Sequence, residues 1–121
     1  MKVVKVDSVP KNIATSPLFI GGQVTQQPIV TLAMSKYFVI SQVTFAPGAR
    51  NKFHSHTTDQ VLIVTAGKGI VATENEQITV TVGDVIQFPA GEKHWHGATK
   101  DSSFSHIYVT GIDSKTTQLE Q

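Results

Sequence analysis

The sequence predicts an all-β protein, built as a sandwich or a barrel. Three observations support this prediction. Apolar and polar residues alternate along several short segments, Gly and Pro recur between those segments, and no segment has the periodicity of a long helix. Many short strands joined by tight turns are typical of β-sandwiches and β-barrels.

The first thirty residues are predicted to form an extended arm that leads into the first strands. Residues 3–6 have the pattern of a short strand. The rest of the arm is broken too often for a helix, by three prolines and two glycines: Pro10, Pro17, Gly21, Gly22 and Pro28. The apolar side chains of the arm need cover, which either the domain's own sheet or a second subunit can provide.

The clearest alternation of apolar and polar residues runs from 37 to 46. Near the end of this predicted strand one face is the more apolar, so Ser41, Val43 and Phe45 are placed inward. The turn at Pro47 and Gly48 then ends the strand.

Shorter strands are predicted along the rest of the chain. Residues 60–66 form an apolar run that the sequence Gly-Lys-Gly at 67–69 closes. Residues 70–73 and 77–82 predict a hairpin, residues 85–88 a short strand, and residues 103–110 the last clear strand. The polar tail, residues 113–121, is predicted to be frayed.

Composition limits the class of protein. A chain of 121 residues corresponds to one domain, and a net charge of +1 gives no reason to expect nucleic acid or a membrane as partner. The absence of cysteine excludes disulfides and thiolate metal sites. No apolar run reaches the length of a membrane span, and the first residues lack a signal-peptide core. We therefore expect a soluble, cytoplasmic protein.

Two short histidine clusters lie between Gly48 and Ala98. They are His54-Ser55-His56 and His94-Trp95-His96, and they contain four of the five histidines. In an extended segment, residues i and i+2 point to the same face. Neutral imidazoles bind divalent transition metals, so two imidazoles from one strand and one from a facing strand can form a tripod around an ion.

The spacing around these clusters resembles the two motifs of the cupin family. Gly48-x5-His54-x-His56-x3-Gln60-x6-Gly67 resembles the first motif, and Gly83-x5-Pro89-x-Gly91-x2-His94 resembles the second. The resemblance implies a small single-domain cupin, a double-stranded β-helix or jelly-roll barrel. Its arm and first strands would span residues 1–30, its barrel core 31–112 and its tail 113–121. By position, the metal ligands would be His54, His56, Gln60 and His94.

The chain departs from the family pattern at two positions. Gln60 stands where the first motif has glutamate, and Ala98 where the second has asparagine. The residue at 98 is not a ligand in the family. A neutral amide at position 60 leaves the full charge on the ion, which should bind less tightly but act as a stronger Lewis acid.

A bacterial subgroup of small cupins also has glutamine at the position of Gln60. Residues 91–98 together with 104–106 resemble this subgroup, which includes manganese-dependent hydroxynitrile lyases. The resemblance implies one divalent ion per chain, manganese first, with iron, nickel or zinc as alternatives. It also implies that His106 transfers the proton when a cyanohydrin is cleaved to an aldehyde and cyanide. Cupins often pair through the arm and outer sheet, which implies a homodimer.

Several side-chain roles have alternatives. Ser41, Val43 and Thr110 are expected to shape the pocket by position, and His96 to support the metal site rather than bind the ion. His106 is either the base or a core histidine satisfied by hydrogen bonds, and Gln60 either a ligand or a buried amide. The alternatives to a lyase are an oxygen-dependent cupin dioxygenase and a non-catalytic cupin that binds a small molecule.

Overall fold

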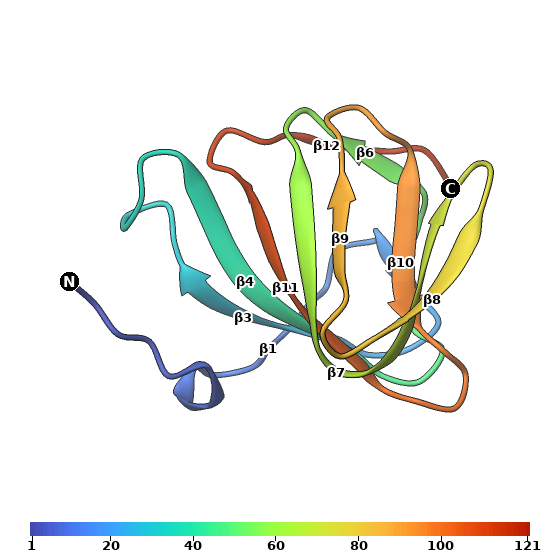
Figure 1. The fold of residues 1–121 in the computed structure, drawn as a ribbon, viewed down its shortest axis with the longest axis horizontal. Helices are drawn as coiled ribbons and strands as arrows, with labels where there is room; N and C mark the ends of the chain where they lie inside the picture. Colours follow the sequence, from blue (N-terminus) through green and yellow to red (C-terminus); the bar gives the residue numbers. More distant parts are fainter.

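The computed structural model describes all 121 residues and shows a curled β-sheet that forms an open half-barrel (Figure 1). Its only helix is the short 3-10 helix η1 (Val6–Ser8). The strands in chain order are β1 (Asn12–Ile13), β2 (Phe19–Ile20), β3 (Val24–Val30), β4 (Phe38–Phe45), β5 (Arg50–Asn51), β6 (His54–His56), β7 (Gln60–Thr73), β8 (Gln77–Thr81), β9 (Val85–Phe88), β10 (His94–Ala98), β11 (Phe104–Gly111) and β12 (Thr116–Gln118). The predicted all-β class is confirmed. No helix has the length and hydropathy needed to cross a membrane.

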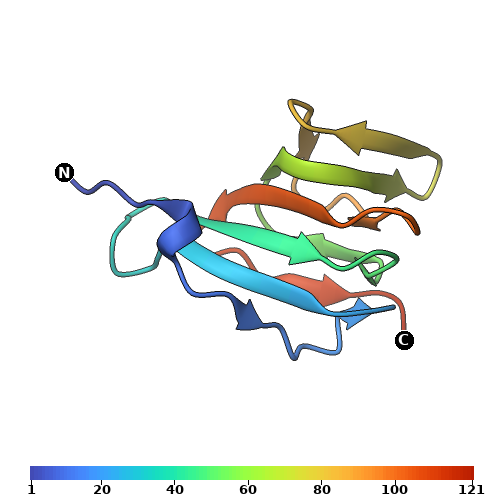
Figure 2. The same ribbon diagram turned by 90° about the horizontal axis from the view of Figure 1, so that it is seen from below.

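One wall of the half-barrel consists of β3, β4, β11 and β7, which are hydrogen-bonded neighbours in this order (Figure 2). β4 and β11 pair antiparallel along their whole length, from Phe38 opposite Gly111 to Phe45 opposite Phe104. Burial alternates along β4, and Ser41, Val43 and Phe45 are buried as predicted. The alternation fixes the register because a slip of one residue would turn the apolar face toward solvent.

β7 joins this wall to the opposite one. The predicted break at residues 67–69 is wrong, because β7 continues without interruption from Gln60 to Thr73. Its first half pairs with β11 and β9, and its second half with β10 and β8. At the crossing point Gly67 has φ +70, and a Cβ atom there would collide with the backbone oxygen of Ser103. Gly67 therefore allows the bend of one long strand and does not end it.

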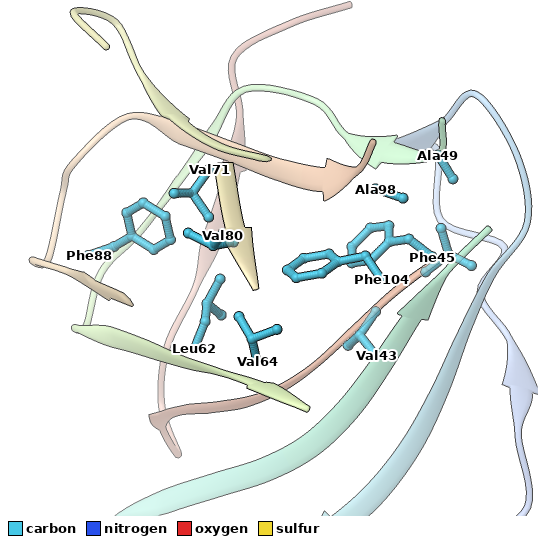
Figure 3. Close-up of a cluster of buried hydrophobic side chains, with 11 residues drawn as sticks. Val43, Phe45, Ala49, Leu62, Val64, Val71, Val80, Phe88, Ala98 and Phe104 are labelled. Carbon is cyan, nitrogen blue, oxygen red and sulfur yellow. The ribbon is translucent and has the colours of Figure 1, made fainter. Parts of the chain in front are cut away.

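The apolar core fills the space between the two walls (Figure 3). Phe45 and Phe104 are both fully buried, and their stacked rings lie 6.0 Å apart between centroids. Leu62 and Val64 project from β7 into the same cluster. Each such side chain contributes about 1.5–3 kcal/mol of hydrophobic stabilisation, so the core holds the walls at a set distance.

The arm is partly tied to the domain's own sheet. The predicted strand at residues 3–6 is absent, and the chain instead enters η1 and then β1, which pairs with β3. Gln27, which is only 2% exposed, donates from Nε2 to the carbonyl oxygens of Val6 and Val9 at 3.0 and 2.9 Å. These two side-chain hydrogen bonds, and not strand pairing, hold the first residues of the arm against β3.

The polar tail is ordered, contrary to the prediction that it is frayed. β12 pairs antiparallel with β6, with Thr116 opposite His56 and Gln118 opposite His54. Glu120 forms a two-pronged ion pair with Arg50, at 2.7 and 3.2 Å, and accepts the Phe53 backbone N–H at 3.0 Å. The charged and polar residues of the tail have specific partners, which local polarity does not reveal.

Candidate metal centre

Three histidines converge at the mouth of the half-barrel. His54 and His56 come from β6 and His94 from β10, and the register of these two strands sets His94 opposite His54. One nitrogen from each ring lies within 4.8 Å of the others. His54 and His94 are each 1% exposed, and His56 is half-buried. The structure therefore brings together the three histidines that the spacing singled out.

A separate hydrogen bond orients each of the three rings. Nδ1 of His54 donates to the Lys52 carbonyl at 2.6 Å, and Nδ1 of His94 donates to the Glu92 carbonyl at 2.9 Å. Because a carbonyl oxygen only accepts, the proton of each ring sits on Nδ1 and the lone pair on Nε2. Nδ1 of His56 instead meets the hydroxyl of Thr116 at 2.9 Å.

The remaining nitrogens are poorly matched to one another. Oε1 of Gln60 lies 3.3 Å from Nε2 of His94, where two lone pairs would face each other. Nε2 of His56 is buried and has no hydrogen-bond partner. Buried polar atoms normally have a partner, and a cation placed among these acceptors would provide one. Three imidazoles and one amide oxygen thus fit a divalent transition metal.

Burial keeps these imidazoles neutral. Desolvation lowers the pKa of His94 to about 3 and, together with the neighbouring His54, lowers that of His56 to about 4. Burial also lowers the pKa of His54, although its bond to the Lys52 carbonyl opposes this change. The neutral form is the one that binds metal, so the site needs no proton release near pH 7.

A cavity of about 400 Å³ opens beside the cluster. His54, His56 and Gln60 lie on its wall, and Phe19, Val43, Phe45, Tyr108 and Thr110 are among the other lining residues. None of the side chains that line it belongs to Asp, Glu, Lys or Arg. The cavity therefore suits a ligand whose body is uncharged.

The structure places the expected pocket residues differently, and His96 is one of those that line the cavity. Val43 and Thr110 line the cavity, but Ser41 does not, although it is buried. Ser41 pairs with Tyr108 across the β4–β11 ladder, and the longer tyrosine lines the cavity in its place.

His106 projects from β11 into the same cavity. It is fully buried, and neither ring nitrogen has a hydrogen-bond partner. Burial lowers its pKa to about 4. A core histidine satisfied by hydrogen bonds would have partners, so the ring is available to a ligand in the cavity.

His96 stands apart from the three-histidine cluster. Its ring centroid is 5.9 Å from that of His94 and 4.8 Å from that of His106. Asn51 holds it from two directions, because Oδ1 accepts the His96 backbone N–H at 2.8 Å and Nδ2 donates to the ring Nε2 at 3.2 Å. Burial and the other imidazoles hold the pKa of His96 well below its usual value.

Sequence reasoning missed three residues that shape this centre. Asn51 fixes His96, Phe88 stacks on His94 with ring centroids 3.8 Å apart, and Thr116 contacts His56. Asn51 and Phe88 lie near the motif residues but have no distinctive spacing. Thr116 is sixty residues from its partner, and only the pairing of β12 with β6 brings it close.

Comparison with known proteins places this geometry in context. Residues 41–110 match the family model described as "Cupin domain". Over 70 residues, 57% of this chain and 53% of the relative, the sequence is 44% identical to an (R)-mandelonitrile lyase of Granulicella tundricola. It is 34% identical to an acireductone dioxygenase of Trichormus variabilis over 51% of this chain and 37% of that protein. The chain thus spans about half the length, or less, of these curated relatives.

Solved structures agree on the fold. A cupin-like protein from Thermotoga maritima superposes with a TM-score of 0.84 at 30% identity, covering all of this chain and 90% of that one. The polyketide cyclase RemF from Streptomyces resistomycificus gives a TM-score of 0.89 at 18% identity over all of this chain and 87% of that one. At that identity the second likeness concerns the fold alone.

Proposed function

The chain belongs to the cupin family, and within it we propose a metal-dependent lyase that cleaves a hydroxynitrile or a similar small hydroxy compound. One observation carries the proposal. An unpartnered buried imidazole, His106, lines the same uncharged cavity as His54, His56 and Gln60, and the first two of these converge with His94 in one cluster of neutral donors. The likeness of over half the chain to a relative named (R)-mandelonitrile lyase supports the same reaction class.

We assign His54, His56, Gln60 and His94 as the residues that would hold one divalent ion. All four donors are uncharged at pH 7, so they would leave the charge of the ion uncompensated. When bound, such an ion supplies Lewis acidity at the oxygen of the substrate. We propose manganese, with iron, nickel or zinc as alternatives that the same donors accept.

His106 is proposed as the proton acceptor. With a pKa of about 4 it is neutral at pH 7, and both nitrogens are free of protein partners. It would take the hydroxyl proton of the cyanohydrin as the carbonyl forms. The C–C bond to the nitrile then breaks, and its electron pair leaves with the nitrile carbon. Return of the proton from His106 to cyanide completes the balance as hydrogen cyanide.

The rest of the cavity would hold the body of the substrate. Val43, Phe45 and Tyr108 provide apolar surface next to His106. Because no charged side chain lines the cavity, an aryl or alkyl group can be buried there without leaving a charge unpaired.

The test is cleavage of mandelonitrile by manganese-loaded protein, followed as release of benzaldehyde. We expect activity that His106→Ala lowers by about 10²–10⁴-fold, the usual contribution of a positioned base. Wild-type protein that cleaves no faster than His106→Ala would contradict the proposal.

A dioxygenase is the second candidate, favoured by the relative named acireductone dioxygenase. The neutral donor set weighs against it, because anionic donors are better at stabilising a metal in a higher oxidation state. An oxygen electrode with the iron-loaded protein and diketone or phenolic substrates separates the two reactions. A binding protein without catalysis would show a ligand-dependent thermal shift and no turnover.

A further inference from the structure

We propose that strand β12 is part of the metal centre and that Thr116 is a positioning residue, whose hydroxyl orients His56 for the ion. This inference rests on the proposed metal site. It gives a role to the tail segment that looked featureless in the sequence.

His56 differs from the other two histidines in how its ring is held. His54 and His94 each donate from Nδ1 to a carbonyl two residues earlier in their own segment. His56 has no such local acceptor, and its Nδ1 meets Oγ1 of Thr116 at 2.9 Å. His56 is also the only one of the three that is not fully buried, so packing constrains its ring least.

The backbone around Thr116 is held on both sides. On one side the Thr57 N–H donates to the Lys115 carbonyl at 3.0 Å, and the Lys115 N–H donates to the Thr57 hydroxyl at 2.9 Å. On the other side the Leu119 N–H donates to the Phe53 carbonyl at 2.8 Å. The ion pair between Arg50 and Glu120 closes the far end. The hydroxyl thus sits on a strand whose position relative to β6 is fixed (Figure 1).

The hydroxyl holds one orientation of the ring, and because it can accept as well as donate it suits the tautomer with the proton on Nδ1. When Oγ1 accepts the proton on Nδ1, the lone pair resides on Nε2, the buried atom of His56 that has no partner in the protein. Partners of this kind, which hold the second nitrogen of a ligand histidine, typically change metal affinity by about 10–100-fold. Thr116 is exposed, so water can replace the hydroxyl in part, and we expect the lower end of this range.

The strand supplies its own matched control. Thr117 is equally exposed and pairs with Ser55, and its side chain points to the opposite face of the strand from that of Thr116. Val has nearly the shape of Thr but no hydroxyl. Thr116→Val and Thr117→Val therefore make the same chemical change on the two faces of one strand.

The experiment measures the affinity of the full chain for Mn²⁺ alone, by titration in competition with a chelator and without substrate. Thr116→Val should bind about tenfold more weakly, Thr116→Ser should retain wild-type affinity, and Thr117→Val should be unchanged. Thermal unfolding of each metal-free variant checks that the fold is intact.

Two results would overturn the inference in different ways. If Thr116→Val binds Mn²⁺ as tightly as wild type, β12 has no role in the centre, but the proposed lyase site stands. If the wild-type chain binds no Mn²⁺, the metal site is refuted and the role of Thr116 with it.

Discussion

Replacing His106 with leucine should make the metal-free protein less sensitive to acid. In the unfolded chain a histidine gains its proton near pH 6.5, whereas folded His106 stays neutral until the pH falls to about 4. Between these values the unfolded state binds more protons, so lowering the pH destabilises the fold. The gap from 6.5 to about 4 corresponds to about 3.4 kcal/mol in full, at about 1.4 kcal/mol per pH unit.

Most of that loss falls in a range where the protein can be measured. Between pH 8 and pH 5, His106 alone should remove about 2 kcal/mol from the free energy of unfolding. His106→Leu lacks this contribution, while the other four histidines titrate in both proteins. The substitution also removes two buried nitrogens without partners, which should stabilise the fold by about 1–3 kcal/mol at pH 8.

The assay is urea denaturation of both proteins with chelator at pH 8 and pH 5. The expected result is a variant that is more stable at pH 8 and loses about 2 kcal/mol less on acidification. Equal losses in the two proteins would refute the reasoning, since they would mean that His106 is hydrated and titrates normally. The same variant should cleave mandelonitrile about 10²–10⁴-fold more slowly, so stability and activity would change in opposite directions.

Two further substitutions test the centre. Gln60→Glu puts a carboxylate beside three imidazoles and should tighten Mn²⁺ binding by at least about tenfold. It should also slow mandelonitrile cleavage, because the added negative charge reduces the Lewis acidity of the ion. Titration with Mn²⁺ and the cleavage assay on one sample check both effects, and weaker binding would count against Gln60 as a donor. Asn51→Ala removes both hydrogen bonds to His96 and leaves the buried His96 backbone N–H unpaired. It should therefore lower the free energy of unfolding, measured by urea denaturation, by about 1–3 kcal/mol. Unchanged stability would show that water takes the place of Asn51.

Local patterns were enough to predict most strands and the three-histidine cluster. The alternation along β4 follows directly from having one buried face. His54 and His56 share a face because they are two residues apart, and the second motif predicts His94 as their partner, which the pairing of His94 with His54 matches. Each of these inferences uses only neighbours in sequence or the spacing of a motif.

The wrong predictions all depend on contacts between distant segments. Gly67 and Gly69 look like a turn, yet they sit within β7 because Ser103 and Phe104 press against them. The tail looks free because its polar residues find their partners elsewhere, as Glu120 does in Arg50. Sequence periodicity does not indicate which polar residues of distant segments will form a hydrogen bond or an ion pair with one another.

The central place of β7 also has a consequence for how the protein folds. Its partners β8, β9, β10 and β11 all follow it in the chain. The pairing of β4 also needs β11, which lies some sixty residues later in the sequence. Such non-local pairing is typical of proteins that fold in milliseconds to seconds. Before β11 has paired with them, β4 and β7 each have an open strand edge that can pair with another molecule. Refolding at low protein concentration and low temperature should therefore recover more native protein than refolding at high protein concentration.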